Sequence, residues 1–175
     1  MGALIQAYAW GDTPLGSMER WPQSLWSALS ICLSTRLPVC IYWGPQYVML
    51  YNDAWRTIPG GRHPWALGKT APEVWAEIWS SAGVRFDHVF TKGVEASAED
   101  RPMVMTRFGR AEECYFNYTL TPIRDEIGKT AGISPSQRRR PIASWPSDAL
   151  VCCESSLHAR RVYRRWKVSA NRPRL

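Results

Sequence analysis

Two short β-rich runs on either side of a tight turn constrain the fold of this chain more than any other feature. The runs are residues 39–43 (VCIYW) and 47–51 (YVMLY), and the turn between them reads GPQ. β-Branched and aromatic runs separated by a few residues that include Gly are typical of a β-hairpin. An isolated hairpin is marginally stable in water, so the rest of the chain must supply more strands or a covering layer.

The segment before the hairpin predicts a helix. In residues 21–36 (WPQSLWSALSICLSTR), Leu25, Leu29 and Cys32 recur at helical spacing and form an apolar stripe. Pro38 then ends the helical pattern. The chain therefore enters its hairpin from an amphipathic helix.

The segments after the hairpin predict further helices. Asn52 and Asp53 offer an N-cap for a short helix (AWRTI), and Thr70 and Glu73 form a capping box before the helical pattern TAPEVWAEIW. The next helical piece, AGVRFDHVFTKG, stops at Gly93. The residues of that piece expected to face inward are Val84, Phe86, Val89 and Phe90.

The second half of the chain alternates as strands do. Residues 111–125 (AEECYFNYTLTPIRD) place Tyr118 and Leu120 on one face and Thr119 on the other. The turn DEIG follows, and KTAGI begins a final strand. Strands at both ends of the sequence with helices between them favour an α+β domain with an antiparallel sheet.

These motifs, taken together, resemble one known family. The stretches that carry the resemblance are WGDTPLG, WPQSL, IYWGPQYVMLYNDAW, RHPWALGKTAPEVWAEIW and RFGRAEECYFNYTLTPIRDEIGKTAGI. Over roughly residues 8–133 the chain resembles a PAS domain of the type found in bacterial multi-domain sensor (hybrid) histidine kinases. The resemblance implies a five-stranded antiparallel sheet of order 2-1-5-4-3, with helices on one face that enclose a small pocket.

The resemblance also divides the chain into three parts. Residues 1–36 are expected to form an N-terminal helical extension, residues 37–133 the PAS domain, and residues 134–175 a basic, disordered tail. The tail holds nine Arg and one Lys against Asp148 and Glu154, a net charge of +8, so residues 1–133 carry −1. The basic pI therefore says nothing about what the folded part binds.

The junction at Ile133 suggests a frameshift. The family's last strand lies in the middle of the sheet, and Pro135 cannot donate a hydrogen bond to such a strand. With suitable codons, a shifted reading frame from Ser134 onward can encode TETTADRVLAERRL, the helix that follows the last strand in the family. We therefore expect a PAS domain that is truncated or frameshifted after about Ile133, with its downstream kinase module absent from this chain.

A genuine tail is the alternative. It interleaves Arg runs with Tyr163 and Trp166, a composition that can contact phosphates and stack on bases. On that interpretation the chain is a small basic nucleic-acid-binding protein that acts through its tail.

The candidate site is an aromatic pocket. Ten Trp in 175 residues indicate a core rich in aromatic rings. The residues predicted to line the pocket are Trp55, Trp75, Trp79, Phe86, Phe90 and His88. The competing interpretation is that the aromatic residues only fill the core. His88 would be the ligand if the pocket held haem, whereas no cysteine lies in the NCRFLQ-like motif that flavin-adduct PAS domains require.

Catalysis is not expected. The sequence has neither a phosphoacceptor-helix pattern nor a Gly-rich ATP lid, and no acid, base and nucleophile converge in it. The resemblance instead implies a sensory or interaction module that responds to a small-molecule ligand or partner by a conformational shift, and that can form a homodimer. No cofactor is predicted.

The cysteines and the N-terminus favour a cytoplasmic protein. An odd number of cysteines with no metal-ligand spacing and no secretion signal is typical of reduced thiols. They are Cys32, Cys40, Cys114, Cys152 and Cys153. No apolar run is long enough for a membrane span, so neither a membrane nor a metal is predicted as a partner.

Overall fold

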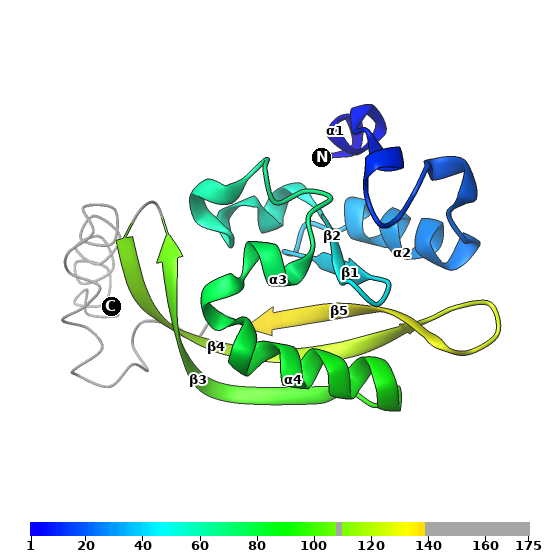
Figure 1. Ribbon diagram of the computed structural model, residues 1–175. Coiled ribbons are helices and arrows are strands. Elements are labelled where there is room, and N and C mark those ends of the chain that lie inside the picture. Colours follow the sequence, from blue (N-terminus) through cyan, green and yellow to red (C-terminus); the bar gives the residue numbers. More distant parts are fainter. Residues whose placement is uncertain (108–109, 139–175) are drawn as a thin grey trace, which may run out of the picture.

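The computed structural model describes residues 1–107 and 110–138 (Figure 1). Its helices are α1 (Gly2–Ala7), α2 (Gln23–Ser34), α3 (Ala71–Val74) and α4 (Ala76–Lys92). Its strands are β1 (Cys40–Trp43), β2 (Val48–Tyr51), β3 (Ala96–Arg107), β4 (Arg110–Arg124) and β5 (Thr130–Arg138). Short 3-10 turns occupy Trp10–Asp12, Met18–Arg20, Asp53–Thr57 and Gly60–Arg62.

The five strands form one antiparallel sheet of order β2-β1-β5-β4-β3, which confirms the predicted order and the α+β class. The last strand lies between the first and the fourth. β5 pairs with β1 at Ile133 opposite Tyr42, and with β4 at Ile133 opposite Pro122. The alternating pattern of β4 is also confirmed where its side chains are described, because Tyr118 and Leu120 are both buried.

The last strand extends beyond Ile133, into the segment expected to form the disordered tail. β5 continues to Arg138, and Pro135 lies opposite Leu120 of β4 within the strand. The proline is tolerated because the register of β5 with β1 stops at Ile133. Beyond that point β5 is paired on one side only, as an edge strand is, and the Ser134 hydroxyl donates to the Cys40 carbonyl across the gap (3.3 Å).

Two helix ends lie where local sequence rules place them. The capping box of Thr70 and Glu73 starts α3, and Gly93 ends α4 with a left-handed φ of 65°. The predicted boundary between the two helical pieces is wrong, because the helix breaks at Trp75 and α4 then continues without interruption through residues 76–92. Figure 1 shows α4 lying along the sheet over β3–β5. Val84 was expected to face inward and is 69% exposed instead, since it lies two residues from the buried Phe86 on the helix.

The N-terminal extension contributes to the same core. Ile5, Trp10 and Trp21 are buried, and the two indole rings meet edge to face at 5.0 Å. Each indole N–H is satisfied locally, from Trp10 to the Ile5 carbonyl (2.7 Å) and from Trp21 to the Gly16 carbonyl (3.0 Å). These tryptophans come from the WGDTPLG and WPQSL motifs, which therefore act in packing.

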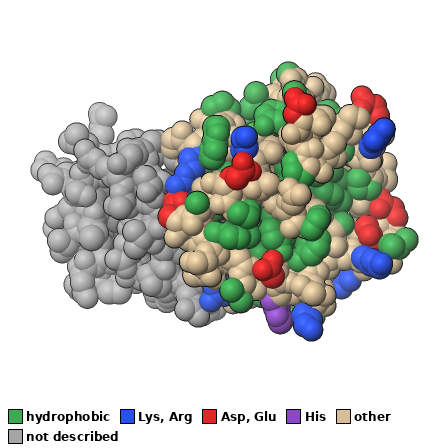
Figure 2. Space-filling model, viewed as in Figure 1, with side chains coloured by type: hydrophobic (Ala, Val, Ile, Leu, Met, Phe, Trp, Pro, Cys, Tyr) green, Lys and Arg blue, Asp and Glu red, His purple; other side chains and the backbone are tan. Residues whose placement is uncertain are grey.

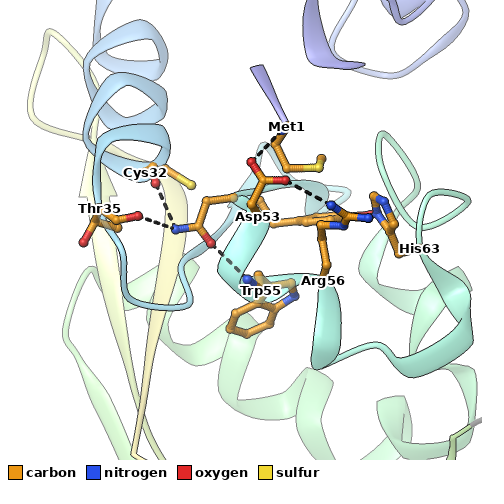
Figure 3. Close-up of polar contacts among 9 residues, drawn as sticks. Met1, Cys32, Thr35, Asp53, Trp55, Arg56 and His63 are labelled. Atoms are coloured by element: carbon orange, nitrogen blue, oxygen red, sulfur yellow. Dashed lines mark hydrogen bonds and ion pairs between the residues drawn. The ribbon is translucent and has the colours of Figure 1, made fainter. Parts of the chain in front are cut away.

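Asn52 connects the extension to the hairpin. It is 2% exposed. Its Nδ2 donates to the carbonyl oxygens of Cys32 and Thr35 (3.1 Å each, Figure 3) and to the carbonyl oxygen of Leu37 (2.7 Å). Its Oδ1 accepts from the backbone N–H groups of Val39 and Trp55. The predicted N-cap role is confirmed, and the same side chain also satisfies carbonyls at the end of α2.

The described surface carries both signs of charge. Figure 2 shows Lys and Arg side chains interspersed with Asp and Glu over the face in view, around hydrophobic groups. This face offers no single-signed patch of the kind that attracts nucleic acid. Among the helices of residues 1–107 and 110–138, none combines the length and the apolar character needed to cross a bilayer.

Candidate ligand-binding core

An aromatic cluster fills the space between the hairpin and α4. Tyr42 on β1 meets the ring of Phe86 edge to face at 4.9 Å. Tyr47, in the turn just before β2, lies 5.6 Å from both Trp79 and Phe90, measured between ring centroids. Trp79 and Phe86 close the cluster at 5.3 Å. This is the helix-covered face of the sheet, on which the sequence predicted a pocket.

Two hydrogen bonds involve polar groups of the cluster, one buried within it and one partly buried at its edge. The Trp75 indole N–H donates to the Tyr42 hydroxyl at 3.0 Å, and the Tyr47 hydroxyl donates to Asp87 Oδ1 at 2.6 Å. Burial raises the pKa of both tyrosines well above the ordinary value, and the Asp87 carboxylate raises that of Tyr47 further. Both phenols therefore stay neutral at physiological pH, and they act as hydrogen-bonding groups rather than as proton carriers.

Tyr47 adopts an uncommon backbone conformation. Its φ of 54° lies in the left-handed region, which non-glycine residues seldom occupy. The ring contacts and the bond to Asp87 hold the residue there, next to the tight turn that begins at Gly44. The sequence prediction missed both tyrosines of the cluster. All four residues of β1 are buried, so strand alternation does not single out Tyr42, and no local signal marks Tyr47.

Arg62 covers one side of the cluster. Its guanidinium carbon lies 5.3 Å from the Trp75 ring centroid, and its Nη2 forms an ion pair with Glu77. Its Nη1 is buried without a hydrogen-bond acceptor among the described residues, and the same holds for Nε1 of Trp55. Buried donors with no acceptor are costly, so these two could each be stabilised by an acceptor group from a ligand or a water.

The structure brings together only part of the predicted site. Trp75, Trp79 and Phe86 belong to the cluster, with Phe90 at its edge. Trp55 is 1% exposed and belongs to the core, within the 3-10 turn that Asn52 caps.

His88 lies elsewhere. It is exposed on α4, between Asp87 and the buried Val89, so it does not line the cluster. The prediction of a pocket-lining histidine is wrong because successive residues of a helix differ by about 100° in direction, and Phe86 and Val89 already occupy the inward side. The interior residues that the structure describes include no histidine to hold haem iron.

The buried cysteines add no reactive group. Cys32 and Cys40 are both free thiols in the core. Burial raises the pKa of Cys32 to about 12 and that of Cys40 well above its ordinary value. Neither is a thiolate at neutral pH, so neither is an activated nucleophile.

The comparisons with known proteins concern the fold. A scan against protein-family models finds no match, and a search of curated proteins also finds none. Among solved structures, a Rhodobacter sphaeroides LOV protein matches with a TM-score of 0.54 and 12% identity, over 70% of this chain and 69% of that one.

Two further structures match over a similar share of the chain. An RNA-binding Light-Oxygen-Voltage receptor matches with a TM-score of 0.49 and 14% identity over 70% of this chain, which spans only 35% of the receptor. A sensory box sensor histidine kinase from Vibrio cholerae matches with a TM-score of 0.45 and 18% identity, over 68% of this chain and 89% of that one. The match to the Rhodobacter protein shows a shared fold, and the strand order β2-β1-β5-β4-β3 is the order that the sequence resemblance implies for the PAS fold.

Proposed function

We propose that the chain is a non-catalytic sensory module, the input part of a bacterial two-component sensor histidine kinase. The observation that carries the proposal is the aromatic cluster, which lies where α4 covers the sheet of a PAS fold and contacts the central strands through Tyr42. The kinase context rests on the sequence resemblance, and the kinase itself would lie in the frame-shifted continuation. We place this module in the cytoplasm and expect it to associate as a homodimer.

The mechanism follows from one contact path. A ligand that enters the cluster would change how Phe86 packs on Tyr42, and Tyr42 is paired with Ile133 of β5. β1 and β5 are in register at only two residue pairs, Tyr42 with Ile133 and Trp43 with Gly132. Because this pairing is short, a small movement of β1 can change how β5 pairs with it. β5 is the strand that leads out of the domain.

A ligand screen with matched variants tests the sensory site. Compounds that raise the melting temperature of the full chain are first identified, and each is retested on Phe86→Trp and on Val84→Trp. Phe86 is 8% exposed within the cluster and Val84 is 69% exposed on the same helix. We expect Phe86→Trp to abolish the shift by filling the interior and Val84→Trp to retain it. Compounds that stabilise both variants equally would bind elsewhere and contradict the proposed site.

Two further experiments test the kinase context. Resequencing the gene through codons 120–175 should reveal a gained or lost base near codon 133. The chain as it stands should incorporate no phosphate from labelled ATP. An intact reading frame, with a shifted frame that encodes nothing like the expected helix, would remove the histidine-kinase proposal.

Nucleic-acid binding by the tail is the second candidate, and it is favoured by the net charge of +8 over residues 134–175. Residues 139–175 lie outside the described part of the chain. A mobility shift with single-stranded DNA at low salt, lost when those residues are deleted, would support this function. No shift at low salt would remove it.

A further inference from the structure

A cavity lies apart from the aromatic cluster. It is a groove of about 430 Å³, within the usual size range of small-molecule sites, between the N-terminal extension and the loop before α3. The polar residues that line it include Tyr8, Asp12, Gln46, Lys69, Thr70 and Glu73. None of these residues belongs to the aromatic cluster.

The floor of the groove is held in place by the backbone. Gly68 donates its N–H to the Met49 carbonyl (3.0 Å), and the Lys69 carbonyl accepts from the Met49 N–H (2.9 Å). Gly68 has a φ of +74°, and an added Cβ would lie 2.6 Å from Cε1 of Tyr8. Only glycine permits this approach, so the Tyr8 ring rests directly on the loop that forms the floor.

The charges of the groove have both signs. Asp12 and Glu73 contribute carboxylates, and Lys69 contributes an ammonium group. Hydrogen bonds from the Thr70 hydroxyl and backbone N–H lower the pKa of Glu73, which is therefore ionised at neutral pH. A polyanion such as a nucleotide would meet the two carboxylates, and a simple amine would meet the lysine. A molecule with both charges can pair with all three groups.

We propose that the groove binds a small zwitterion of the α-amino acid class. Its carboxylate pairs with Lys69, and its ammonium group pairs with Asp12 and Glu73. Because Tyr8 and Asp12 come from the extension whereas Lys69 and Glu73 come from the PAS core, the ligand bridges the two. This site is separate from the aromatic cluster, and its occupancy stabilises the docked position of the extension.

Calorimetric titration of the full chain with glycine, alanine, glutamine and glutamate, one at a time, tests the proposal. At least one is expected to bind, and its analogue with an acetylated amine and an amidated carboxyl is not. Lys69→Gln and Asp12→Asn each remove one charged partner and should weaken binding about tenfold or more. Lys129→Gln, which removes a charge from the exposed β4–β5 turn, is the matched control and should bind as the original chain does.

The inference is overturned if no amino acid tested binds, if the uncharged analogue binds equally well, or if Lys69→Gln leaves binding unchanged. Phe86→Trp, which blocks the aromatic cluster, should leave amino-acid binding intact. If Phe86→Trp abolishes binding, the ligand occupies the cluster and the groove is not the site.

Discussion

At the scale of single residues, Asn52 connects the end of α2, the start of the hairpin and the turn after it by side-chain hydrogen bonds. Its amide satisfies three carbonyls around the end of α2 and two N–H groups, one at the start of the hairpin and one in the turn after it. Since Nδ2 has two hydrogens for three acceptors, one hydrogen is shared. The side chain is buried, so water cannot replace these bonds.

We predict that Asn52→Ala lowers the free energy of unfolding by at least about 3 kcal/mol, because several buried backbone groups lose their partners at about 1–3 kcal/mol each. Asn52→Asp should be comparably harmful, since it keeps the shape but directs a carboxylate oxygen at carbonyl oxygens. Urea denaturation measures both effects. Arg56→Ala, which removes only an exposed ion pair with Asp53, is the control and should stay within about 0.5 kcal/mol. A mild Asn52→Asp variant would show that the donated bonds matter little.

At the scale of elements, α2 is capped at its N-terminus by a residue far away in the sequence. Its N-cap position is Pro22, which provides no side-chain cap. Instead Glu126, in the β4–β5 turn, accepts a hydrogen bond from the Ser24 N–H at 2.7 Å. This bond lowers the pKa of Glu126, and the positive end of the helix dipole favours the same ionised form. The contact connects the extension with the turn that leads into the last strand.

The Glu126 contact predicts a specific acid response. A carboxyl whose pKa is lower in the folded state contributes stability above its ordinary value of 4.5 and loses it as the pH falls through the lower, folded value. The urea midpoint of the original chain should therefore fall more steeply below about pH 4.5 than that of Glu126→Gln.

Glu95→Gln is the control for this experiment, because Glu95 is exposed just before β3, remote in sequence from α2. It should keep the acid slope of the original chain. Parallel curves for Glu126→Gln and the original chain would show that the distant cap contributes nothing measurable.

At the scale of the whole molecule, the extension and the PAS domain share one core. Ile5, Trp10 and Trp21 belong to the same buried cluster as Leu50 of β2 and Ile133 of β5. The boundary expected at residue 36 therefore does not separate two cores. Removing the extension would expose the hydrophobic residues of the hairpin on its α2 side, so the two parts should unfold together.

The length of β5 gives the prediction for the whole molecule. Residues 134–138 pair with residues 117–121 of β4. A chain that ends at Arg138 should melt in one cooperative transition. A chain that ends at Ile133 should melt at a markedly lower temperature or aggregate, because each unpaired buried group costs about 1–3 kcal/mol against a typical total of about 5–15 kcal/mol. Calorimetry of both chains measures the difference. Equal melting temperatures would mean that the segment after Ile133 adds nothing to the sheet.

The sequence by itself determined the elements whose signals are local. The capping box of Thr70 and Glu73, the stop at Gly93 and the apolar stripe of α2 depend on residues a few positions apart, and all are confirmed. The sheet order followed from the resemblance to the PAS family and not from periodicity, because pairing partners such as Tyr42 and Ile133 are far apart in the chain.

Only the tertiary structure decided what depends on distant contacts. Pro135 forbids a strand by local rules, yet β5 passes through it because β1 no longer pairs there. His88 lies between aromatic residues in the sequence and was predicted to line the pocket. In the structure it is exposed, because α4 packs on the sheet with another side. Tyr47 acquires its left-handed backbone, and Glu126 its role as a cap, from partners forty or more positions away. Such contacts form only when the chain is folded, so no short window of sequence contains them.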